Sequence, residues 1–206
     1  MDYTTVERVK QEMHIVSGSS TDDALLAALV TSASRAWDRL CTGVMDAENY
    51  FLREDVVDEV LEGQIDYLGQ AILCYPHKPI VHSVSSFTFQ ARSIDAAYTV
   101  DPSRIDFAGT RVVAYPASLA IGFPSKCRVV ISYNGGLATS GSALPADMQE
   151  LVSILAARFY REAETSLADS IGVAELAQLV YTRAYPVRVV DGAEFYKRRV
   201  GWRHPA

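Results

Sequence analysis

Apolar residues recur with a helical period in residues 144–161. The positions that share one helix face, spaced i, i+3, i+4, i+7 and i+11, are Met148, Leu151, Val152, Leu155 and Phe159. Pro145 suits the first helical position, where no backbone N–H is needed, and Asp147 complements the helix dipole. We therefore predict a helix that begins at about Pro145 and ends between Arg161 and Glu164.

The N-terminal region predicts two more helices. Thr4 and Glu7 have the spacing of a capping box at the start of a short helix. A longer helix is expected to be capped within residues 20–23 and to stop at Gly43. Its apolar face comprises Leu26, Leu29, Val30, Ala33, Trp37 and Leu40. Residues 170–180 contain enough apolar positions for one further helix.

Between about Glu48 and Tyr133 the pattern changes to short runs rich in β-branched and aromatic residues, separated by glycine and proline. Runs of this kind favour strands. The candidate strands are Tyr50–Arg53, Val56–Leu61, Ile72–Tyr75, Val81–Phe89, Ala97–Val100, Ile105–Phe107, Arg111–Tyr115 and Cys127–Tyr133. A last strand-like run, Val187–Val190, precedes Asp191 and Gly192, which can form a turn.

Together these elements predict an α+β fold. Helices from the N- and C-terminal parts form a small helical bundle, and an antiparallel β-sheet or small barrel is inserted between them. The expected segments are N-terminal helices in 1–47, the β insertion in 48–136, C-terminal helices in 137–182 and an extended C-terminal tail in 183–206.

Composition and charge narrow the function classes. The chain is 49% hydrophobic and 21% charged, as expected of a globular protein, and no apolar run is long enough for a transmembrane helix. The N-terminus does not resemble a signal peptide, so a cytoplasmic location is expected. Residues 183–206 carry six Lys and Arg against two acids, or +4; subtracting this from the net −6 leaves −10 on residues 1–182. An acidic body argues against tight binding to DNA or to an anionic membrane.

The sequence contains no recognisable catalytic, cofactor or metal site. Cys41, Cys74 and Cys127 form no CxxC pair and are expected to be buried, reduced thiols. His77 and His82 are not spaced to share a face of one element, so no metal ligation is expected. No nucleophile, phosphate-loop or metalloprotease motif is present, which predicts a protein that is not an enzyme and needs no cofactor.

Two charged segments are left open. Glu54–Glu62 holds five acids in nine residues, which either form a solvated face or line a concave surface that repels DNA. The C-terminal segment interleaves aromatic and basic residues, types that are enriched in protein interfaces. The residues that could dock on another protein are Tyr185, Arg188, Phe195, Tyr196, Arg198, Arg199 and Trp202. The alternatives are a frayed basic C-terminus, a segment folded back on its own body, or contact with nucleic acid.

Three stretches resemble the head-to-tail connector, or adaptor, proteins of long-tailed bacteriophages and related gene-transfer particles. The first combines Tyr3–Lys10 with Thr21–Leu26 and the helix that continues to Trp37. The second is Pro79–Phe87. The third joins Val129–Gly136 to Leu144–Met148 and the helix that follows. The likeness covers about residues 3–162, and it rests on the order and spacing of the motifs.

The resemblance implies a structural virion protein. It would form a ring, usually of twelve copies, between the portal protein and the stopper or tail-completion protein, and double-stranded DNA would pass through the ring without tight binding. The implied location is the virion neck, with the host cytoplasm as the place of assembly. Portal docking by the C-terminal residues is an inference from their charge and aromatic content, because residues 185–202 match no motif of the family.

Three rival functions remain at this point. A tail terminator or stopper would act in the same neck region but is usually richer in strands. A small cytoplasmic enzyme would need a pocket that holds His77 or His82 beside a buried carboxylate. A regulator that binds nucleic acid through its C-terminal segment would show salt-dependent DNA binding.

Overall fold

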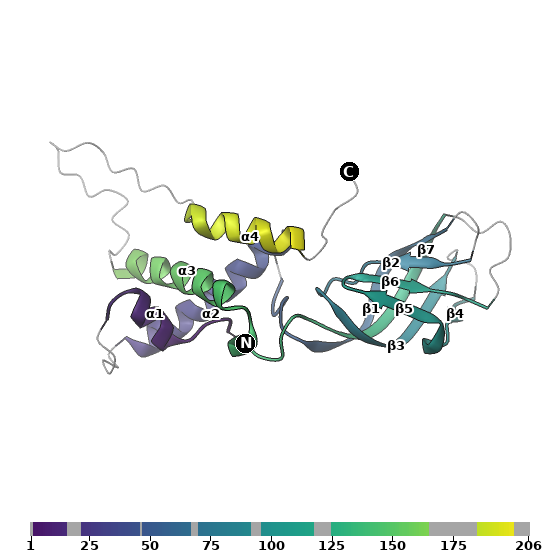
Figure 1. Cartoon of the computed structure of the whole chain (residues 1–206), viewed down its shortest axis with the longest axis horizontal. Coiled ribbons are helices and arrows are strands. Elements are labelled where there is room, and N and C mark those ends of the chain that lie inside the picture. The colour runs from purple at the N-terminus through teal and green to yellow at the C-terminus, as the bar shows by residue number, and fades with distance from the viewer. Residues whose placement is uncertain are drawn as a thin grey trace. The chain divides into compact units, whose positions relative to one another are not determined.

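A computed structural model describes most of the chain (Figure 1). The described residues are 2–15, 22–45, 47–66, 70–91, 96–117, 125–164 and 185–199. They divide into two compact units, which we call the helical unit (residues 1–49 and 140–197) and the β unit (mainly residues 50–139). The helix predicted at residues 170–180 lies outside the described part. Within that part, no helix is long and apolar enough to cross a membrane.

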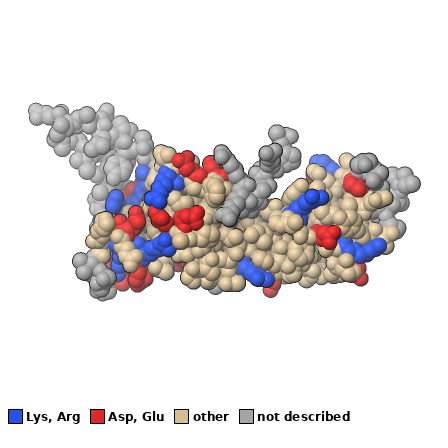
Figure 2. Space-filling model, viewed as in Figure 1, with Lys and Arg blue, Asp and Glu red and all other residues tan. Residues whose placement is uncertain are grey.

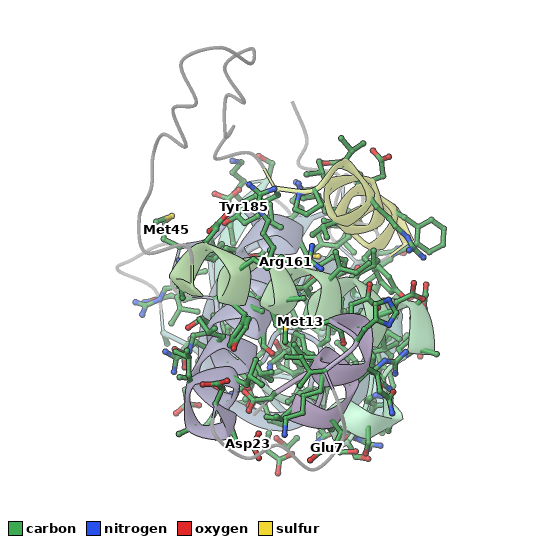
Figure 3. All side chains as sticks on the ribbon, turned by 90° about the vertical axis from the view of Figure 1, so that its left-hand side faces the viewer. Glu7, Met13, Asp23, Met45, Arg161 and Tyr185 are labelled. Atoms are coloured by element: carbon green, nitrogen blue, oxygen red, sulfur yellow. The ribbon has the colours of Figure 1, made fainter. Side chains whose placement is uncertain are left out.

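The helical unit contains α1 (Val6–Glu12), α2 (Asp23–Thr42), α3 (Ala146–Glu164) and α4 (Val187–Arg199). A short 3₁₀ turn, η2 (Gly141–Ala143), precedes α3. Helix α3 packs against both α1 and α2, and it lies between α1 and α4 in the two ribbon views (Figures 1 and 3). The predicted apolar faces of the two long helices are confirmed in the main, because their central members are buried. Helices from both ends of the chain therefore share one core.

The ends of these helices differ from the predictions in detail. Thr5, not Thr4, caps α1, since the Arg8 N–H donates to Thr5 Oγ1. Thr4 is buried and its hydroxyl lies 2.6 Å from that of Ser153, which ties the N-terminus to α3. Gly43 ends α2 in the left-handed conformation, at φ 71°, as predicted.

A tertiary hydrogen bond also explains why the start of α2 and the buried face of α3 differ from the predictions. Asp22 makes no capping bond to α2; its carboxylate instead accepts from the Tyr160 hydroxyl at 3.0 Å. Tyr160 is buried at the end of α3, whereas the predicted Phe159 is only half-buried. A tyrosine can be buried at a helix end when its hydroxyl reaches a partner, and Asp22 provides that partner.

The strand predicted at Val187–Val190 is wrong, because these residues form the first turn of α4. Val189, Ala193 and Tyr196 lie on one face of that helix and are buried. A Cβ on Gly192 would come within 2.4 Å of Leu151 Cδ1, so this glycine allows close helix packing and does not form the predicted turn. Packing of one apolar face outweighs the strand preference of the valines. The expected extended tail is therefore a helix over residues 187–199.

The β unit is one antiparallel sheet curled into a half-barrel, in the strand order β4-β3-β7-β1-β2-β6-β5. Its strands are β1 (Glu54–Ile65), β2 (Ile72–Cys74), β3 (Val81–Gln90), β4 (Tyr98–Thr99), β5 (Ile105–Ala108), β6 (Arg111–Ala114) and β7 (Lys126–Gly135). Seven of the eight candidate strands are thus confirmed. The exception is Tyr50–Arg53, where Leu52 alone makes an isolated bridge, to Ala138.

The concave face of the sheet holds the core of the β unit. Its fully buried members include Phe87, Ile131, Ile72 and Val112 from four different strands. The curl brings β3 close to the β5–β6 hairpin, where the Val81 N–H donates to the Gly109 carbonyl at 2.7 Å. The α+β class is confirmed, with a curled sheet as the inserted element.

Gly63 is expected to be essential to this core. A Cβ there would lie 2.5 Å from Val129 Cγ2 and 2.9 Å from Cys127 Sγ, both inside the packed face. Gly63→Ala should destabilise the β unit by about 1–3 kcal/mol through overpacking. Urea unfolding followed by circular dichroism measures the loss. The double variant Gly63→Ala/Cys127→Ala should recover part of it, and an unchanged midpoint for the single variant would contradict the prediction.

Candidate partner-binding surface

Helix α4 carries most of the residues predicted to dock on another protein. Its inner side is held by a polar contact, as the Tyr196 hydroxyl donates to Asp147 Oδ1 at 2.8 Å. The Tyr196 ring also meets Trp37 edge to face, with 5.9 Å between the ring centroids. Arg188 forms an ion pair with Glu150 at 2.6 Å on the solvent-exposed side of the same contact. The helix is thus anchored to both α2 and α3.

Three other apolar residues of α4 are exposed. Val187 is 75% exposed, Val190 39% and Phe195 51%, although the Phe195 ring touches that of Tyr196. Lys197 forms an ion pair with Glu194 one turn earlier. We call Val187, Val190 and Phe195 the outer face of α4. An amphipathic helix normally exposes polar residues, so these exposed apolar residues make α4 a candidate for contact with another protein.

The seven predicted docking residues lie in different environments in the structure. Tyr185, 39% exposed, precedes α4 (Figure 3), and Phe195 belongs to the outer face. Arg188 is exposed but pairs with Glu150, and Tyr196 is buried in the helical unit. Arg198 and Arg199 form the last turn of α4, and Trp202 lies outside the described residues.

Sequence reasoning missed Val187 and Val190, because these residues were assigned to a strand. A helical period over 187–199 would have found them. It places Val189, Ala193 and Tyr196 on one side, and Val187 and Val190 away from it.

The acids of Glu54–Glu62 are not a bare anionic strip. Each has a polar partner within the β unit: Glu54 with Lys78, Asp55 with Asn134, Asp58 with Ser132, Glu59 with His77 and Glu62 with Lys126. On the visible face of the helical unit, basic and acidic side chains are likewise interspersed (Figure 2). Local pairing therefore reduces the anionic field that the sequence count suggests.

The described residues form little that resembles a reaction centre. No group of three His, Cys, Asp or Glu side chains among them is placed to hold a metal ion. A hollow of about 340 Å³ at one end of the β unit is lined by Leu61, Glu62, Gln90, Ala91, Lys126, Cys127 and Arg128. Burial raises the pKa of the Cys127 thiol to about 11, so at neutral pH it remains protonated and a poor nucleophile. All three cysteines are free and buried, as predicted.

The histidines also have local partners. His77 contacts Glu59, and His82 Nε2 lies 2.8 Å from the Gly136 carbonyl oxygen. The rival enzyme function required a pocket around one of these histidines and a buried carboxylate. Glu59 does have a side chain only 12% exposed, but the hollow described above is lined by neither histidine.

Comparison with known proteins returned structural matches only. No protein-family model and no curated protein matches the sequence. The chain is similar to one in the neck of an empty GTA particle computed with C6 symmetry, at 20% identity and TM-score 0.49, over 93% of this chain and 88% of that one. It is also similar to a chain of a native gene transfer agent (GTA) virion, at 17% identity and TM-score 0.46, over 93% and 87%. A third match is a chain in the neck of a native GTA particle computed with C12 symmetry, at 18% identity and TM-score 0.41, over 94% and 93%.

Proposed function

We propose that this protein is a structural component of a virion neck, namely a head-to-tail connector (adaptor) that forms a ring between the portal and the stopper or tail. DNA would pass through the ring without being bound tightly. The protein would assemble in the host cytoplasm and act without catalysis or cofactor.

The observation that carries the proposal is the place of the three connector-like stretches in the fold. The first forms α1 and α2, and the third forms β7 and α3. Although more than a hundred residues separate α2 from α3 in sequence, α1 and α2 both pack on α3. The second stretch, Pro79–Phe87, leads into β3, which pairs with β7. Helices from both ends around an inserted β element are the arrangement that the resemblance implies.

The outer face of α4 supports a role in assembly. It lies on a helix whose other face is buried. A partner with an apolar groove would bury these exposed residues. We assign the portal as that partner, with Tyr185, Val187, Val190 and Phe195 as the contact residues. Tyr196 is excluded from the contact set because it is buried in its own chain.

Mixing the purified protein with its portal and imaging the particles by electron microscopy tests the proposal. We expect a ring of additional density on the tail-side face of the portal, with the protein present in stoichiometric amount. Binding to tail-completion proteins alone would identify a stopper or terminator instead. Absence of the protein from purified particle necks would contradict a neck role altogether.

A further inference from the structure

The loop between β2 and β3, residues 75–80, is held in a strained conformation. We call it the strap. Pro76 and Pro79 donate no backbone hydrogen bond, and Ile80 has φ 60°, in the left-handed region that β-branched residues rarely occupy. Such a residue costs about 1–3 kcal/mol and persists only where its surroundings hold it. Contacts with neighbouring residues must therefore hold the strap in this conformation.

Its neighbours are the two segments at which the β unit begins and ends, residues 51–53 and 135–138, which we call the stem. The stem segments bond to each other, as the Leu137 N–H donates to the Phe51 carbonyl at 2.8 Å and the Arg53 N–H to the Ala138 carbonyl at 2.7 Å. The stem is tight: a Cβ on Gly136 would lie 2.4 Å from the Leu52 carbonyl oxygen.

The strap bonds to both stem segments. Lys78 Nζ donates to the Leu52 carbonyl at 3.2 Å, and the Gly136 N–H is shared between the carbonyls of Pro79 and Ile80, each at 3.0 Å. Opening the strap would therefore remove bonds from both sides of the stem at once.

Two acidic side chains of β1 also bind residues of the strap. Glu54 Oε1 accepts from the buried Lys78 Nζ at 2.6 Å in an ion pair. Glu59 contacts His77 through the ring Nδ1, and its carboxylate also faces the His77 N–H at 3.4 Å. The side chain of Glu59 is 12% exposed and that of His77 60%.

A bulge in β1 explains why Glu59 points to the strap. The register with β7 shifts between Val56 and Glu59, and Asp58 adopts φ 54°. After the bulge Glu59 lies opposite Ile131, which in turn lies opposite Phe87, so the carboxylate shares the face of two fully buried apolar residues. A carboxylate in that position is costly unless it is paired, and His77 is its basic partner.

Tyr133 and the ion pair of Glu54 with Lys78 lie beside the contact of His77 with Glu59. The Tyr133 hydroxyl on β7 accepts from the Lys78 N–H at 3.1 Å and also bonds to Glu59; burial raises its pKa well above the ordinary value. The hydrogen bond with Glu59 raises the pKa of His77, against the smaller effect of burial. Histidine is the side chain whose ordinary titration range lies near neutral pH, and His77 is the histidine of this set.

We propose that His77 is a proton-operated latch that, when charged, holds the strap on Glu59 and keeps the stem of the β unit closed. A group whose pKa is raised by folding contributes its stability in full below the unfolded pKa. The contribution disappears as pH rises through the folded pKa. The latch is thus shut in mildly acidic solution and open in mildly alkaline solution. It concerns the β unit alone and is independent of the neck role.

Amide hydrogen exchange of the intact chain tests the latch. The reporters are the N–H groups of Lys78, Gly136 and Leu137, corrected for the intrinsic pH dependence of exchange. Between about pH 5.5 and about pH 8.5 we expect their opening equilibrium to rise about threefold, the size of a partly exposed ion pair. A nuclear magnetic resonance titration of the His77 ring should give a pKa above the usual histidine value. In Glu59→Gln the pKa of His77 should fall towards that usual value.

Three variants make the result decisive. In Glu59→Gln, the opening equilibrium of the reporter amides should equal the alkaline value of the natural chain at both pH values. In His77→Lys, which keeps its charge, it should equal the acidic value at both. Glu62→Gln is the matched control, since Glu62 lies on the same strand and forms a solvent-exposed ion pair with Lys126. Its reporter amides should show the same pH response as those of the natural chain. A natural chain with no pH response beyond intrinsic exchange would overturn the latch. So would a full response in His77→Lys, even if Glu59→Gln did not fold.

Discussion

The double variant Val190→Glu/Phe195→Glu is expected to lose attachment to the portal while remaining folded. Both side chains are exposed, at 39% and 51%, so glutamate can reach solvent at either position, although Phe195→Glu gives up the ring contact with Tyr196. In the proposed complex the two residues are buried against the portal, and each new carboxylate would then be desolvated without a partner. Central apolar residues of an interface commonly contribute about 2 kcal/mol each, so affinity should fall by at least about 30-fold.

Co-sedimentation of the variant with portal rings measures this loss. The control is Val57→Glu/Val60→Glu, which places the same charges on two exposed valines of β1, 72% and 52% exposed, in the β unit. That control should attach normally. Undiminished attachment of the α4 variant, with circular dichroism showing an intact fold, would remove α4 from the portal contact. Point variants are preferable to deletion of residues 184–206, because deletion also removes Val189, Ala193 and Tyr196 from the core of the helical unit.

Trp37→Ala is expected to be the most destabilising single substitution in the helical unit. Trp37 is fully buried, lies on α2 and meets Tyr196 of α4, so its loss leaves a cavity between the two helices. Truncation of a buried tryptophan costs about 3–5 kcal/mol. The unfolding of the helical unit, followed by far-ultraviolet circular dichroism in urea, should shift to a correspondingly lower concentration.

Two milder variants separate the causes of that loss. The Trp37 indole N–H is buried and has no hydrogen-bond partner among the described residues. Trp37→Phe therefore gives up surface but no hydrogen bond, and it should cost much less than Trp37→Ala. Tyr196→Phe removes the bond to Asp147 and should cost about 1 kcal/mol. If Trp37→Phe proved as damaging as Trp37→Ala, the cavity explanation would fail.

Local patterns were sufficient wherever one element buries one face. The period of Met148, Leu151, Val152 and Leu155 predicts α3, and all four residues are buried. The strands of the β unit are also read directly from short β-branched runs. In these segments, local propensity and tertiary packing favour the same conformation, so the pattern alone is informative.

The candidate surface was predicted less well, for a physical reason. Val187–Val190 has the composition of a strand, and nothing in the run itself reveals that Gly192 fits against Leu151 or that Tyr196 reaches Asp147. Those contacts join α4 to a helix that lies more than twenty residues earlier in the chain. They convert an expected extended tail into a packed helix, and they move Tyr196 from the predicted docking set into the core.

By itself, the sequence determined the identity and order of most elements: two helical ends, a β insertion, and three buried thiols without a metal motif. It did so because side-chain periodicity is a local property of helix and strand. Only the tertiary structure decided which apolar residues of α4 are exposed and that His77 contacts Glu59. Glu59 and His77 are eighteen residues apart and meet only because a bulge turns one strand and a strained loop crosses it. Such pairings depend on where the chain returns in space, which no local pattern records.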